Sequence, residues 1–106
     1  MEELLKLKQT LDELVELIEK NDCPGKNDRI LTRVRFLAAQ MAGRDSYITE
    51  KAGRIASQAA AFYSAKSERD PSAARELLTE ISYDLPSRIR AQIATLQEYA
   101  RKRDED

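Results

Sequence analysis

Apolar residues recur at intervals of three and four along most of this chain, with polar residues between them. The runs are Leu4, Leu7, Leu11, Leu14 and Ile18; Ile30, Val34, Leu37 and Met41; Ile48, Ala52, Ile55, Ala59 and Phe62; Leu77, Leu78, Ile81 and Leu85; and Ile89, Ile93, Leu96 and Ala100. This spacing keeps apolar side chains on one face of an α-helix. It predicts an all-α protein in which almost every large apolar residue belongs to the core.

Turn and capping residues divide this pattern into segments. Pro24 and Gly25 form a strong turn signal, and Asp70 followed by Pro71 is typical of a helix start. Pro86 removes a backbone hydrogen bond and disfavours helical geometry in the residue before it, so we expect a kink or short break there. The predicted helices cover residues 2–20, 29–42, 46–67, 71–85 and 87–101.

The stretch from Gly43 to Ser46 leaves two topologies open. Gly43 can end one helix in the left-handed conformation while Asp45 or Ser46 caps the next, which gives an antiparallel bundle of four to five helices. If the helix instead continues, one helix over residues 28–66 forms part of an elongated three-helix hairpin. That helix would be about 58 Å long and would protrude from a domain of this size. We therefore favour the break.

The chain length of 106 residues fits a single domain. We assign the bundle to residues 1–101, and we expect the charged residues 102–106 to fray. No apolar run approaches the roughly 20 residues that a membrane-spanning helix needs. The one cysteine, Cys23, allows no internal disulfide, so the chain fits a reducing compartment, and we expect a cytoplasmic location.

The net charge of −1 hides an uneven distribution. Residues 1–25 carry a net charge of −4, residues 26–54 carry +4, and residues 55–106 carry −1. Opposite charges on neighbouring helices favour one pairing and orientation, and this is the simpler interpretation of the pattern.

The composition excludes several kinds of catalytic and metal site. The sequence contains no histidine, which removes the commonest general base and metal ligand and every nucleophile–histidine arrangement. The closely spaced carboxylates Asp12, Glu13 and Glu16 lie opposite the leucine stripe, where we expect ordinary solvated groups. We predict no enzymatic activity, no cofactor, no bound metal and no small-molecule substrate.

Small residues form two columns between residues 52 and 61, one of which contains Ala52, Ala56 and Ala60. Small side chains allow a second helix to approach closely, and aromatic residues such as Phe62 and Tyr63 often anchor such contacts. Close packing inside the monomer is the simpler interpretation of the columns. As a functional hypothesis, these five residues form a protein interface.

A basic stripe precedes this region. Lys26, Arg29 and Arg33 recur at helical spacing with Arg35 to one side, and such a face can track phosphates. We see no aromatic residue interleaved among these arginines, so stacking on single-stranded bases is unsupported. Salt bridges to the acidic first helix and ordinary surface exposure are the simpler interpretation of the stripe.

The sequence thus favours a non-enzymatic module that associates with itself or with a protein partner, such as an adaptor, chaperone or accessory subunit. The alternative is a nucleic-acid-binding protein that uses the basic helix around residues 26–35.

Overall fold

The computed structural model describes residues 2–105, with side chains described for residues 2–103. Within this range the chain is helical and contains no strand. The elements are α1 (Glu2–Lys20), α2 (Asp28–Gln40), α3 (Ser46–Phe62), the 3₁₀ helix η1 (Ala65–Arg69), α4 (Pro71–Thr79), the π-helical turn η2 (Glu80–Asp84) and α5 (Leu85–Glu105). The prediction of an all-α protein is confirmed.

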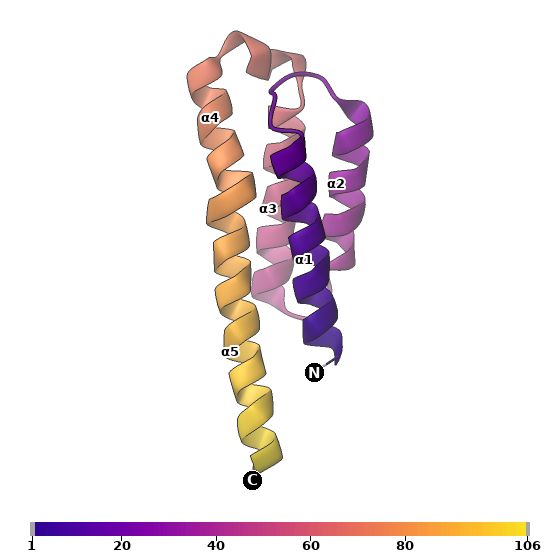
Figure 1. Ribbon diagram of the computed structural model, residues 1–106, viewed down its shortest axis with the longest axis vertical. Coiled ribbons are helices and arrows are strands. Elements are labelled where there is room, and N and C mark those ends of the chain that lie inside the picture. The colour runs from indigo at the N-terminus through magenta and orange to yellow at the C-terminus, as the bar shows by residue number, and fades with distance from the viewer. Residues whose placement is uncertain (1, 106) are drawn as a thin grey trace.

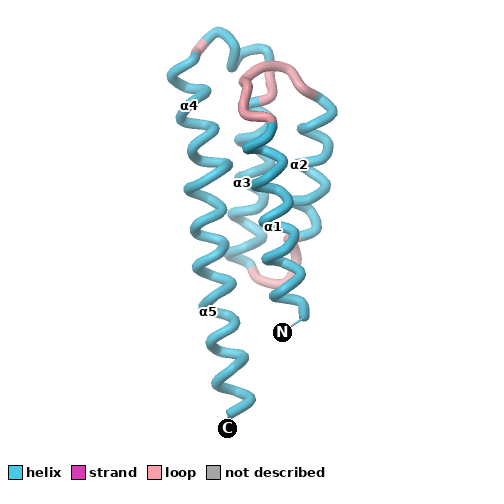
Figure 2. Tube along the Cα trace, viewed as in Figure 1, coloured by secondary structure: helices cyan, strands magenta, loops and turns pink. Residues whose placement is uncertain are grey.

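The helices form an antiparallel bundle (Figure 1). α1 packs against α2 and α5, while α3 packs against α2, α4 and α5. α4, η2 and α5 follow one another without a loop, so they act as the fourth and longest rod of the bundle (Figure 2). The molecule measures 56 Å along its longest axis and 23 and 21 Å across it, because the end of α5 extends past the N-terminus of α1.

Side-chain caps fix where three of the helices begin. The side chains of Asn27, Asp45 and Asp70 accept hydrogen bonds from the backbone N–H groups of Ile30, Ile48 and Ala73, at 3.3, 2.9 and 3.1 Å. Each bond satisfies an N–H group that lacks a partner within its helix.

The break between the second and third predicted helices is also confirmed. Gly43 has a φ of +108°, a left-handed conformation that ends the path of α2 before Asp45 caps α3. The alternative topology, with one helix over residues 28–66, is therefore wrong.

The helix continues through Pro86, so of the predicted kink or short break the break is absent. The preceding turn widens into the π-helix η2, in which the N–H of Leu85 donates to the carbonyl of Glu80 five residues back. A wide turn gives room for the proline ring, which would clash with the carbonyl four residues earlier in a regular α-helix.

Two predicted helix ends also need correction. α3 ends at Phe62, five residues early, because the carbonyls of Phe62 and Tyr63 accept hydrogen bonds from the N–H groups of Gly25 and Asn27, at 3.2 and 3.3 Å. The hydroxyl of Ser67 donates to the Phe62 carbonyl as well, at 2.5 Å. The second correction concerns the C-terminal helix. α5 continues to Glu105 instead of ending at residue 101, and Asp106 lies outside the described residues.

The predicted apolar faces meet in a single core that runs the length of the bundle. Most residues of the predicted runs are buried, and Leu4, Ile30, Leu77, Leu78, Leu96 and Ala100 lie half-buried at its edges. The core gains Val15, Ala38, Tyr63 and Ala74 beyond the predicted set. Among the described side chains, no buried nitrogen or oxygen atom lacks a hydrogen-bond partner.

Gly25 is the tightest point of the loop that joins α1 to α2. It is buried, its φ is +128°, and a β-carbon added there would lie 2.2 Å from a carboxylate oxygen of Glu68. We expect Gly25→Ala to lower the free energy of unfolding by about 1–3 kcal/mol, chiefly through backbone strain. Urea unfolding followed by circular dichroism measures this change.

Gly53 provides the control with the opposite sign. It lies within α3, and an added β-carbon would meet no atom within 4 Å. Gly53→Ala should raise the free energy of unfolding by about 0.5–1 kcal/mol, because alanine loses less conformational freedom in a helix. Equal effects of the two substitutions would contradict the conformations described for both glycines.

Candidate functional site

The five residues predicted to form a protein interface lie on or near the inner side of α3. Ala52, Phe62 and Tyr63 are 1%, 1% and 2% exposed, while Ala56 and Ala60 are half-buried. The three buried side chains fill the core of their own bundle and are not accessible at its surface in this structure.

The second column of small residues lies on the solvent-facing side of α3. Gly53, Ser57 and Ala61 are exposed, so this second column covers the outer face of α3. The first column serves the close packing of α3 within the monomer, which was the simpler of the two interpretations.

The four residues of the basic stripe are all exposed, on α2 and on the loop before it. Two of them have acidic neighbours within the chain: Arg33 donates to a carboxylate oxygen of Glu13 at 2.7 Å, and the Lys26 ammonium lies 4.0 Å from Asp28. Arg29 and Arg35 form no ion pair within 4 Å with any side chain of residues 2–103. The predicted salt bridging to α1 therefore accounts for Arg33 and leaves two arginines facing solvent.

A groove between α1 and α2 runs beside this stripe. It has a volume of about 690 Å³ and is lined by Leu17, Asn21, Asn27, Arg29, Ile30, Thr32, Arg33 and Phe36. The lining combines three apolar side chains with two cationic ones and no carboxylate. We call this surface the Phe36 groove.

Phe36 is the residue that the sequence analysis missed. Its side chain is 53% exposed, and the guanidinium of Arg33 lies 5.4 Å from the centre of its ring. The expectation that no aromatic residue interleaves the arginines is wrong. Sequence spacing could have revealed it: Phe36 follows Arg33 by three residues and Arg29 by seven, so the three residues share one helix face.

The charges beside the groove on α1 are of both signs. The Lys20 ammonium lies 2.8 Å from Glu16, whose carboxylate accepts its hydrogen bond and raises the pKa of Lys20. Glu13 on α1 likewise pairs with Arg33 on α2, so α1 carries two carboxylates and a lysine here, whereas the charged lining residues of the α2 side are arginines.

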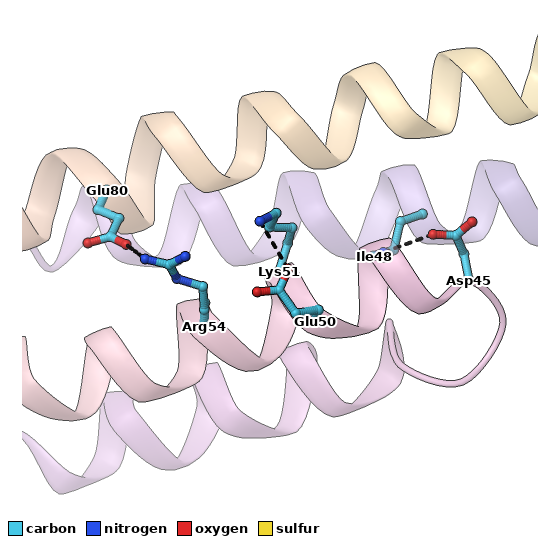
Figure 3. A network of polar contacts seen from close by, with 6 residues as sticks. All are labelled: Asp45, Ile48, Glu50, Lys51, Arg54 and Glu80. Carbon is cyan, nitrogen blue, oxygen red and sulfur yellow. Dashed lines mark hydrogen bonds and ion pairs between the residues drawn. The ribbon is translucent and has the colours of Figure 1, made fainter.

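A second groove, of about 500 Å³, lies between α3 and the α4–α5 rod. Four cations and three carboxylates line it: Lys51, Arg54, Arg75, Arg88, Glu76, Glu80 and Asp84. Glu80 accepts a hydrogen bond from Arg54 at 3.3 Å, and Lys51 lies 3.0 Å from Glu50 (Figure 3). Gln58 also donates to Glu80, at 2.9 Å. Arg54 and Gln58 on α3 thus bind Glu80 on η2, and the groove carries charges of both signs and so offers no field of a single sign.

The Phe36 groove therefore offers apolar surface and cationic side chains, and none of its lining residues is a nucleophile paired with a base. Within residues 2–105, no group of three or more histidine, cysteine, aspartate or glutamate side chains is placed to hold a metal ion. In the same range no helix is both long and apolar enough to cross a membrane. Comparison with protein-family models, curated proteins and solved structures gave no match for this chain.

Proposed function

We propose that this protein is a non-enzymatic helical interaction module that contacts another protein through the Phe36 groove, as an adaptor, chaperone or accessory subunit does. The observation that carries the proposal is the 53% exposure of Phe36 beside the half-buried Leu17 and Ile30. Aromatic and arginine side chains are the residues that most often dominate binding at protein interfaces. Here they lie together on one helix face.

We also propose a cytoplasmic location. Cys23 is the sole cysteine of the sequence, and it is exposed and free. A free exposed thiol and the absence of a disulfide are typical of proteins in a reducing compartment.

Binding of single-stranded nucleic acid is the second candidate, since Phe36 supplies the aromatic surface that such binding uses beside Arg29, Arg33, Arg35 and Lys26. The charge of α1 argues against it. A polyanion lying along α2 would pass close to the carboxylates of Glu13 and Glu16, and Glu13 already neutralises Arg33. We therefore place protein binding first.

Replacing Phe36 with aspartate should abolish partner binding and leave the fold intact, because the ring is half-exposed and contributes little to the core. The measurement is affinity purification of the tagged protein from its native host, with the bound proteins identified by mass spectrometry. Circular dichroism checks that the variant is folded. Tyr83→Asp is the matched control, because Tyr83 is 67% exposed and lies on η2, away from the groove.

A protein that co-purifies with the wild type and with Tyr83→Asp but is lost with Phe36→Asp supports the proposal. Partners that are retained by Phe36→Asp contradict it. Co-purifying nucleic acid that is lost at high salt, and with Arg29→Glu combined with Arg33→Glu, would favour the second candidate.

A further inference from the structure

α1 and α2 lie side by side with opposite net charges, and the Phe36 groove lies between them. α1 contains six carboxylate residues and three lysines, whereas α2 contains three arginines and one aspartate. Arg29 and Arg33 line the α2 side of the groove, and we call them the basic strip. Glu13 and Glu16 lie on α1, where they pair with Arg33 and Lys20, and we call them the acidic strip.

This pairing of charges restricts what can lie in the groove. An acidic helix from another protein would be attracted to the basic strip but repelled by the acidic strip a few ångströms away. A basic helix would be attracted to the acidic strip and repelled by the basic strip. The best-matched occupant presents a basic strip to α1, an acidic strip to α2 and an apolar surface between them. The α1–α2 face of this same chain has that pattern.

We propose that the occupant of the Phe36 groove is a second copy of this chain, related to the first by a two-fold axis close to Phe36. This inference rests on the proposed function and names its partner. A two-fold axis that runs along the groove brings the same patch of both copies together and places each acidic strip over the basic strip of the other copy. Both Phe36 rings then enter the centre of the contact, where residues that dominate binding usually lie.

The dimer should be weak. α2 has 13 residues and is about 20 Å long, so the contact falls in the class of small, transient interfaces below about 1,200 Å². Its charges are exposed, so added salt should weaken it further. Association should therefore become visible at micromolar to millimolar protein concentration and in dilute salt.

Light scattering and sedimentation equilibrium over a range of concentrations test the proposal. The wild type and Tyr83→Asp should dimerise with the same dissociation constant. Phe36→Asp should weaken the dimer by about 30-fold or more, the effect expected of a central anchor. A wild type that stays monomeric at millimolar concentration in dilute salt overturns the proposal, as does a dimer that Phe36→Asp leaves unchanged.

Charge reversal provides a sharper test of the two-fold arrangement. One variant reverses the acidic strip through Glu13→Lys and Glu16→Lys, and a second reverses the basic strip through Arg29→Glu and Arg33→Glu. Each variant alone should be monomeric, because like charges then face each other across the axis. An equimolar mixture should form a heterodimer, because the two reversed surfaces are complementary. A mixture that remains monomeric while the wild type dimerises contradicts the arrangement.

These outcomes separate this inference from the function on which it rests. If the wild type is monomeric but binds a different protein from its host in a Phe36-dependent manner, the second copy is excluded and the interaction module remains. If Phe36→Asp changes neither self-association nor any host partner, both proposals fail.

Discussion

Replacing Phe62 with alanine should lower the free energy of unfolding by about 3–5 kcal/mol, the usual cost of removing a large aromatic side chain from a core. Phe62 is 1% exposed, and its ring packs edge-to-face against that of Tyr63 with the ring centres 4.9 Å apart. The substitution leaves a cavity where the end of α3 meets the α1–α2 loop. Chemical denaturation followed by circular dichroism measures the loss.

Phe36→Ala is the matched control, because it removes the same side chain from a half-exposed position. We expect it to lower the free energy of unfolding by less than about 1 kcal/mol. The half-exposed ring gains little from leaving water, and its removal leaves no internal cavity. A small effect of Phe62→Ala would contradict the burial of Phe62, and a large effect of Phe36→Ala would contradict the exposure of Phe36.

Alkaline solution should destabilise the protein between about pH 10 and pH 12 through Tyr63. Burial, with a smaller contribution from the charge of Asp22, raises the pKa of Tyr63 from its ordinary value of 10 to about 12. Below pH 10 the phenol is protonated in both states and its full contribution to stability is present. As the pH rises from 10 to 12, the unfolded state loses its proton first, so about 2 kcal/mol of stability disappears.

Spectrophotometric titration of the tyrosinate band and thermal unfolding at each pH measure this effect. Tyr63→Phe is the control: it should lack the late-titrating phase and the part of the alkaline destabilisation that comes from Tyr63. At neutral pH it should cost about 1 kcal/mol, because the phenol donates a hydrogen bond to the Asn21 carbonyl at 2.8 Å. A titration in which Tyr63 ionises with the exposed tyrosines would contradict its burial.

The sequence predicted the fold well where one local signal dominates. Helical spacing located the core, and Asp70, together with Asp45 as one of two candidates, located two helix starts, because a side-chain oxygen that satisfies a free N–H acts within one turn. The end of α3 was not predictable in this way. It depends on amides from a loop some 35 residues earlier in the chain, which bind the carbonyls of Phe62 and Tyr63.

The candidate site was predicted less well, for a related reason. Phe62 fits the core stripe and also resembles an interface anchor, and Tyr63 was read only as an anchor because it follows the last member of that stripe. The hydrogen bond from the Tyr63 hydroxyl to the Asn21 carbonyl holds Tyr63 inside its own bundle. It joins residues 42 positions apart, so no local pattern in the sequence indicates it. Phe36 was not predicted because it lies outside the apolar stripe of its helix, and helical spacing of apolar residues identifies only residues of that stripe.

The wide turn before Pro86 has an evolutionary consequence. A turn that closes over five residues holds one residue more than an α-helical turn, so a homologue lacking one residue between Glu80 and Asp84 would keep every core position of α5 in phase. A deletion elsewhere in α5 would rotate the following residues by about 100° and expose their apolar face. Because the regular turn has no room for the ring, such a homologue should also have lost the proline. Chain length and residue 86 are therefore expected to vary together in descendants of this protein's ancestor.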